Sequence, residues 1–181
     1  MGRGLAQGGS ATVSAQVEQP MARFVRRTSR GLGPGRDASY PGQVLTIRQD
    51  LVDSMVAHAR QDHPDEACGV IAGPTGSDRP ERFIPMVNAA RSPTFYEFDS
   101  LDLLRLYRDM DDNDEVPVVV YHSHTATEAY PSRTDISYAS EPDAHYVLVS
   151  TRETGSEDGP YELRSYRIVD GVVTEEPITV V

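Results

Sequence analysis

Two histidines, His122 and His124, stand two residues apart at the end of the apolar run V-P-V-V-V-Y. Side chains at positions i and i+2 of a strand point to the same side, so both imidazoles can face one ligand. Asp135 follows eleven residues after His124, where the sequence predicts the first turn of a short helix. Two imidazoles and one carboxylate are a donor set suited to zinc, with a fourth position open for water. We therefore expect a zinc site at His122, His124 and Asp135.

Local structure offers a plainer explanation for parts of this pattern. A His-x-His pair on a strand is often structural, and Ser132 with Asp135 makes the Ser-x-x-Asp spacing of a capping box at a helix start. The whole pattern is His122-Ser123-His124, seven residues, Ser132, two residues and Asp135. Residue usage predicts a chance match in about one chain of this length in a few thousand. The combination favours a metal site, in which bound zinc would lower the pKa of a water toward roughly 7.

The pattern H-x-H-x(7)-S-x-x-D resembles the motif of the JAMM/MPN+ metallopeptidases. The resemblance implies that His122, His124 and Asp135 bind zinc. It also implies that Ser132 forms hydrogen bonds around the catalytic water and the developing oxyanion. Family members use an upstream glutamate as general base, and Glu66 in H-P-D-E-A-C-G matches that position. Such a base must lie within hydrogen-bond reach of the water that it deprotonates.

Two neighbours of Glu66 offer competing chemistry. Asp65 is an alternative base, but Glu66 directly adjoins A-C-G-V-I-A, a segment that reads as a buried strand. Taken alone, Glu66 would more often be an exposed loop carboxylate. The thiol of Cys68 is an alternative nucleophile, although a cysteine in a buried strand is usually just a small apolar residue. We expect Glu66 to be the base and Cys68 to be structural.

Longer segments extend the resemblance over nearly all of residues 43–181. The run N-A-A-R-S-P-T-F-Y-E-F-D, residues 88–99, is similar to a segment that flanks the substrate groove in bacterial members. The runs H-P-D-E-A-C-G-V-I-A-G-P, S-D-R-P-E-R-F-I-P-M and Y-H-S-H-T-A-T-E-A-Y-P-S-R-T-D resemble actinobacterial members that act on a small ubiquitin-like sulfur-carrier protein. Those members release a newly made cysteine from the C-terminal Gly-Gly of the carrier.

The resemblance thus implies hydrolysis of the amide between a carrier glycine and cysteine, as a step of cysteine biosynthesis. It leaves two alternatives open: a general deconjugase that cleaves lysine isopeptides of ubiquitin-like proteins, and a metal-free MPN scaffold. We expect the carrier tail to pair with the backbone of residues 88–98 as an added strand.

Charge and composition limit the partners and the compartment. Residues 1–41 carry six Arg against Glu18 and Asp37, a balance of +4 that leaves −15 for the remainder to reach the net charge of −11. The large negative charge of residues 42–181 argues against nucleic acid as a partner, because binding to phosphates requires a basic surface. No apolar stretch approaches the roughly 18 residues of a membrane helix, and the first forty residues lack a signal-peptide pattern. Because a single cysteine fits a reducing compartment, we expect a cytoplasmic protein.

The expected organisation is a disordered basic tail, residues 1–41, followed by one peptidase domain, residues 42–181. Helices are expected at 50–61 with Asp50 as N-cap, at about 99–110 and at 135–140. Strands are expected at 44–47, 67–72, 83–87, 95–98, 116–121, 144–150, 161–169 and 172–180, with an Asp170-Gly171 hairpin turn between the last two. This order predicts an α/β or α+β fold, and the resemblance implies the JAMM/MPN type: a curved mixed sheet flanked by helices.

Overall fold

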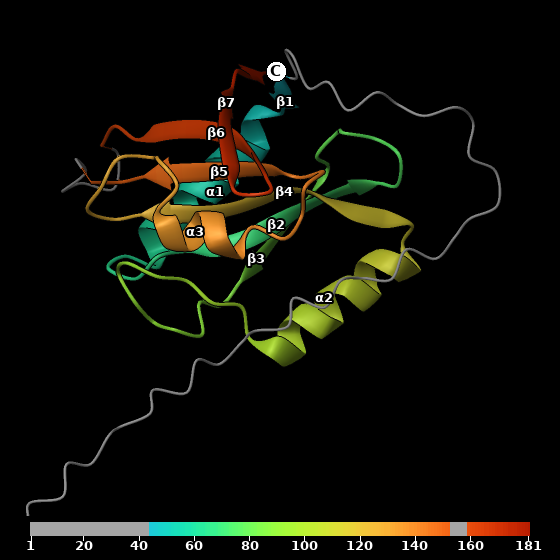
Figure 1. Cartoon of the computed structure of the whole chain (residues 1–181), viewed down its shortest axis with the longest axis horizontal. Helices are drawn as coiled ribbons and strands as arrows, with labels where there is room; N and C mark the ends of the chain where they lie inside the picture. The colour runs from blue at the N-terminus through green and yellow to red at the C-terminus, as the bar shows by residue number, and fades with distance from the viewer. Residues whose placement is uncertain (1–43, 153–158) are drawn as a thin grey trace, which may run out of the picture. The chain divides into compact units, whose positions relative to one another are not determined.

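The computed structural model describes residues 44–152 and 159–181 (Figure 1). The helices are α1 Gln49–Gln61, α2 Ser100–Asp112 and α3 Arg133–Tyr138. The strands are β1 Leu45–Ile47, β2 Cys68–Pro74, β3 Arg82–Met86, β4 Glu115–His124, β5 His145–Ser150, β6 Glu162–Val169, β7 Val172–Glu176 and β8 Ile178–Val180. The expected tail, residues 1–41, lies outside the described residues.

Six of the strands form one mixed sheet in the order β3-β2-β4-β5-β6-β7. The pair β4 and β5 is parallel, and the other pairs of this sheet are antiparallel. The strand that carries the two histidines, β4, lies between β2 and β5 and is buried from its fourth residue onward. The expected mixed sheet flanked by helices is therefore confirmed.

Helices cover both faces of the sheet, with α3 in front of it in the view of Figure 1. On one face, the apolar stripe of α1 packs together with Val119 and Tyr121 of β4. The stripe consists of the buried residues of this helix, Leu51, Val52, Met55, Val56 and Ala59. On the other face, α2 packs against β2 and α3 packs beside Val120 of β4. His122 and His124 follow Val120 in steps of two, so strand alternation directs both imidazoles to the face that α2 and α3 cover.

The antiparallel pair β2–β4 brings Glu66 to that same face. Cys68 is the register partner of His122. The contact extends beyond β2, because Ser123 N donates to Ala67 O at 2.9 Å and Ala67 N donates to Ser123 Oγ at 2.8 Å. One further step of the register sets Glu66 opposite His124, on the side of the sheet that carries the histidines.

Three sequence-based expectations about elements are wrong. The N-cap of α1 is Arg48 and not Asp50, because the helix already begins at Gln49 and Asp50 lies in its first turn, where the carboxylate accepts from the Arg48 guanidinium at 2.9 Å. Residues 95–98 form no strand, because the side chain of Asn88 binds their backbone and leaves an isolated Asn88–Phe98 bridge. The last expected strand is split at Pro177 into β7 and β8, and β8 pairs in parallel with β1.

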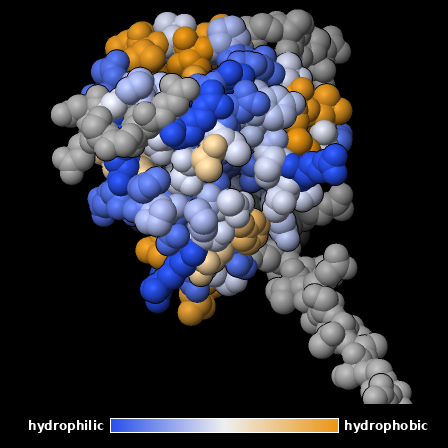
Figure 2. All heavy atoms as spheres, turned by 90° about the vertical axis from the view of Figure 1, so that its left-hand side faces the viewer, coloured by the Kyte–Doolittle hydropathy of each residue, from blue (hydrophilic) through white to orange (hydrophobic). Residues whose placement is uncertain are grey.

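The surface of the described residues shows no extended apolar face in the view of Figure 2, where apolar side chains form small patches among hydrophilic ones. Of the helices in the described ranges, none is both long and apolar enough to cross a bilayer.

Candidate metal centre

The donor atoms of His122, His124 and Asp135 converge on one point. The Nε2 atoms of His122 and His124 are 3.2 Å apart. Asp135 Oδ2 lies 3.3 Å from His122 Nε2 and 3.6 Å from His124 Nε2. Ligands bound at roughly 2.0–2.1 Å to a tetrahedral zinc ion lie about 3.3 Å from one another. Within the described ranges these residues form one group able to hold a metal ion, and their spacing fits zinc.

The protonation states of two of these residues also suit metal binding. Burial lowers the pKa of His122, which favours the neutral imidazole. Burial of Asp135 opposes its ionisation, but hydrogen bonds with His122, His124 and Ser132 outweigh it and hold the pKa of this carboxyl far below its ordinary value. A metal binds neutral imidazole and ionised carboxylate, so both groups are ready to bind without first losing a proton.

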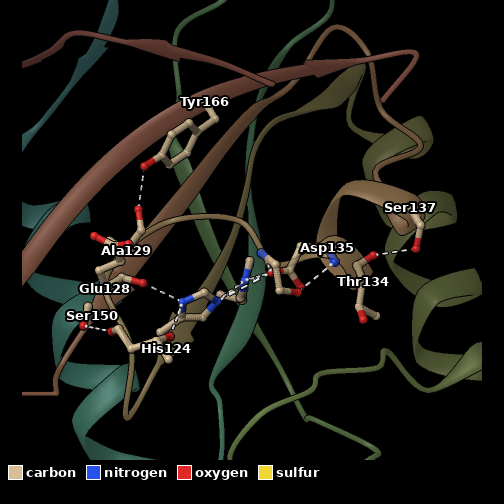
Figure 3. A network of polar contacts seen from close by, with 11 residues as sticks. His124, Glu128, Ala129, Thr134, Asp135, Ser137, Ser150 and Tyr166 are labelled. Atoms are coloured by element: carbon tan, nitrogen blue, oxygen red, sulfur yellow. Dashed lines mark hydrogen bonds and ion pairs between the residues drawn. The ribbon is translucent and has the colours of Figure 1, made fainter. Parts of the chain in front are cut away.

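The tautomer of His124 is fixed by the loop that follows β4. Glu128 O lies 2.8 Å from His124 Nδ1, and since a carbonyl can only accept, the proton resides on Nδ1. In the neutral ring the lone pair is then on Nε2, the atom that faces Asp135; Figure 3 shows His124 between Glu128 and Asp135. Without a metal, burial opposes the charge on this ring, but the contacts with Asp135 and Glu128 outweigh it and raise the pKa of His124. Thr127 Oγ1 lies 3.0 Å from the same Nδ1. Such an arrangement orients a metal-binding imidazole and raises its basicity.

Contacts from neighbouring strands hold this loop in place (Figure 3). Tyr166 Oη donates to Ala129 O at 2.6 Å, and Ser150 Oγ donates to Thr127 O at 2.5 Å. Ala129 N donates to a carboxylate oxygen of Glu162 at 3.1 Å. These bonds flank residue 128 on both sides, so the carbonyl that orients His124 has a fixed position.

His122 is held in a different way. Its side chain is buried, yet no described residue forms a hydrogen bond with its Nδ1. The ring of Tyr96 instead stacks on the imidazole, with a centroid distance of 4.6 Å and an interplanar angle of 25°. The two histidines are thus supported by two kinds of contact.

Asp135 is positioned by the N-terminus of α3. Ser132 is the N-cap, and the two residues form the expected capping box: Asp135 N donates to Ser132 Oγ at 3.2 Å, and Ser132 N donates to Asp135 Oδ2 at 2.6 Å. Ser132 Oγ accepts in this bond, which leaves its hydroxyl able to donate to another acceptor, the Asp135 carboxylate among them.

Glu66 lies buried on the ligand side of the sheet, with 4% of its surface exposed, and is not the exposed loop carboxylate that residue statistics favour. Burial raises the pKa of Glu66 to about 7; the charge of His124 opposes this rise and that of Asp135 adds to it. Asp65 is partly exposed. A carboxyl that titrates near neutrality beside a candidate metal site is suited to accepting and returning a proton.

The alternative nucleophile, Cys68, is fully buried, and burial raises the pKa of its thiol far above the ordinary value. A buried thiol of this kind is unreactive, because the thiolate is the nucleophilic form.

Sequence reasoning assigned no role to Asn88 or Tyr96, although it singled out their segment. The side chain of Asn88 is buried and forms four hydrogen bonds: Nδ2 donates to Glu66 O and Phe95 O, and Oδ1 accepts from Ala90 N and Glu97 N. It thereby joins the backbone of Glu66 to the segment that carries Tyr96.

Comparisons with known proteins show which family the chain belongs to. Residues 48–169 match the family of prokaryotic homologs of the JAB domain. The chain is 72% identical over 138 residues to the CysO-cysteine peptidase of Mycobacterium tuberculosis, covering 76% of this chain and 92% of that protein. It is 32% identical to the desampylase of Haloferax volcanii, covering 59% of this chain and 80% of that one.

A solution structure of a protein from Desulfitobacterium hafniense shares the fold, with a TM-score of 0.65, 33% identity and coverage of 76% of this chain and 93% of that one. The chain therefore belongs to the prokaryotic JAB-domain family and is a peptidase of the JAMM type.

Proposed function

We propose that this protein is a zinc-dependent peptidase that hydrolyses the amide between the C-terminal glycine of a small ubiquitin-like sulfur-carrier protein and a cysteine. The products are the carrier, with a free C-terminal carboxylate, and cysteine. The observation that carries this substrate is the 72% identity to a CysO-cysteine peptidase over 92% of that protein's length.

His122, His124 and Asp135 are the proposed zinc ligands, supported by donor separations of 3.2–3.6 Å. A zinc ion held there supplies Lewis acidity, which lowers the pKa of a water and polarises a carbonyl oxygen. The buried carboxylate of Glu66 accepts the proton of the attacking water and delivers it to the nitrogen of the departing cysteine. Its raised pKa supports this role, because a base that titrates near the working pH also serves as an acid.

Ser132 has two roles in this proposal. Its Oγ caps α3 and so sets the position of Asp135. Its hydroxyl proton is available to the oxyanion that develops on the carrier glycine, where a well-placed donor is worth several kcal/mol, roughly 3–4 when one is removed from other enzymes. Ser132 can therefore be both a helix cap, through its oxygen, and a proposed catalytic donor, through its hydroxyl proton.

Mass spectrometry of the carrier tests the substrate. The full chain is incubated with a carrier that ends in Gly-Gly-Cys, and in parallel with the same carrier joined to a lysine side chain. We expect the mass of the first to fall by one cysteine residue, with Glu66→Gln as the inactive control. No cleavage of the cysteine adduct by zinc-loaded wild type would overturn the proposed substrate.

A general deconjugase is the second candidate. It is favoured by the 32% identity to a desampylase and the 34% identity to a probable TtuB-protein conjugate cleaving protease of Thermus thermophilus. In that case the lysine conjugate is cleaved at least as fast as the cysteine adduct. The scaffold alternative has less support, because all members of the proposed ligand set are present and face one another.

A further inference from the structure

The two histidine ligands differ in what holds them. His124 has a backbone carbonyl at Nδ1, the usual partner of a metal-binding imidazole. His122 Nδ1 is buried and has no hydrogen-bond partner among the described residues. Rotation of the imidazole about its side-chain torsions would move Nε2 away from the other donors. With no bond at Nδ1, this rotation is opposed by the contacts of Nε2 with His124 and Asp135 and by the packing around the ring.

The packing around the His122 imidazole includes a stacked ring. Tyr96 lies 4.6 Å from His122 between centroids and is inclined by only 25°. Its phenol ring covers one side of the imidazole, and turning the imidazole would lose this contact or collide with the ring. Phe98 meets Tyr96 edge-on at 5.5 Å, which supports the phenol ring from another direction.

The backbone around Tyr96 is fixed by Asn88. Asn88 Nδ2 donates to Phe95 O at 3.0 Å, and Asn88 Oδ1 accepts from Glu97 N at 3.2 Å, so the amide binds the residues on both sides of Tyr96. The same Nδ2 donates to Glu66 O at 2.9 Å. Every hydrogen-bonding position of the amide is in use, and an aspartate of the same shape lacks both donors.

We infer that Tyr96 is a positioning residue for the metal centre: its ring, in place of a hydrogen bond, sets the orientation of His122, and Asn88 holds Tyr96 in register with Glu66. This inference rests on the proposed zinc site and adds a specific determinant of its affinity. Tyr96 acts through its ring, so its hydroxyl is not required.

Zinc affinity of the full chain, measured by competition with a chromophoric chelator, tests the inference without reference to cleavage. Tyr96→Leu is expected to bind zinc about 10–100-fold more weakly, the usual loss when a residue supporting a ligand is removed. Tyr96→Phe keeps the ring and is expected to stay within about twofold of wild type. Phe95→Leu is the matched control: it removes the neighbouring ring, which contacts Tyr138 rather than a ligand.

The visible spectrum of the cobalt-substituted protein is a second readout, because it reports ligand geometry directly. We expect it to change in Tyr96→Leu and in Asn88→Asp, but not in Tyr96→Phe or Phe95→Leu. Should Tyr96→Leu be unfolded by circular dichroism, Tyr96→Met fills similar space without a ring and is expected to show the same loss.

Wild-type affinity and spectrum in Tyr96→Leu or Tyr96→Met would overturn the inference while leaving the zinc site intact. So would weakened zinc binding in Tyr96→Phe, since the hydroxyl would then be the important group. Absence of zinc binding by wild type would instead contradict the proposed metal site itself.

Discussion

Glu66 and Asp65 are adjacent carboxylates, and burial distinguishes them. Glu66 is buried on the side of the ligands, whereas Asp65 is partly exposed. Glu66→Gln keeps size and hydrogen bonding but cannot accept a proton, so zinc content is expected to stay at the wild-type value while kcat falls by roughly 10²–10⁴-fold. Asp65→Asn is the paired control and is expected to keep wild-type turnover. A slow Asp65→Asn variant beside a fully active Glu66→Gln variant would reverse the assignment.

Spacing predicted that His122 and His124 share one strand and that Asp135 falls in the first turn of the next helix, and both are confirmed. Strand periodicity sets the two histidines on one side. The approach of Asp135 to them depends on the loop between β4 and α3, which periodicity does not fix. Tyr96 could not be found in this way. Its contact with His122 joins residues 26 positions apart through a loop whose shape depends on one side chain, Asn88.

At the scale of elements, the close approach of β2 to its neighbours depends on Gly69. A Cβ at this position would lie 2.6 Å from Ile84 O and 2.6 Å from the Tyr121 ring, so a strand or a buried ring must shift. Gly69→Ala is expected to lower the free energy of unfolding by about 1–3 kcal/mol, as overpacked cores do. Denaturant unfolding of the metal-free protein measures this. An unchanged midpoint would show that the sheet relaxes at no cost.

Most elements could be predicted from apolar runs and helix caps, and the exceptions have identifiable causes. The helix expected at about 99–110 is α2, and Asp99 caps it by accepting from Leu101 N and Asp102 N. The aromatic run of residues 95–98 has strand propensity, but a side-chain amide occupies the backbone groups that a strand would use. Pro177 ends β7 because proline lacks the N–H that continued pairing requires. Only long-range contacts decide that β8 then pairs with β1.

At the scale of the whole molecule, stability is expected to depend on a cluster of buried polar side chains on β5, β6 and β7. Glu176 accepts from His145 Nδ1 at 2.5 Å, from Ser165 Oγ at 2.7 Å and from Arg167 Nε at 3.2 Å. Burial opposes ionisation of Glu176, but the bonds from His145 and Ser165 and the charge of Arg167 outweigh it and lower the pKa below the ordinary 4.5.

A carboxyl whose pKa is lower in the folded than in the unfolded protein stabilises the fold above its unfolded pKa. This stabilisation is lost as pH falls from about 4.5 through the folded pKa. Glu176→Gln is therefore expected to be less stable than wild type at pH 7 and to show a flatter loss of unfolding free energy between about pH 5 and pH 3. Glu175→Gln, an exposed neighbour, is the control. Parallel pH curves for wild type and Glu176→Gln would exclude this contribution.

The basic tail gives a second prediction for the whole chain. Deleting residues 1–41, whose composition predicts disorder, is expected to leave zinc content, thermal unfolding and cleavage within about twofold of the full chain. All three are measured on the truncated and full proteins side by side. A large loss of cleavage alone would mean that the tail takes part in substrate binding.

Zinc content of the purified protein tests the central claim most directly. Elemental analysis of wild type is expected to give one zinc per chain, and the His122→Ala/Asp135→Ala double variant is expected to give none while keeping its circular dichroism spectrum. The fold is expected to persist because His122 lies near the end of β4 and Asp135 in the short helix α3, while apolar clusters cover both faces of the sheet. A folded wild type that holds no more zinc than the double variant would contradict the account.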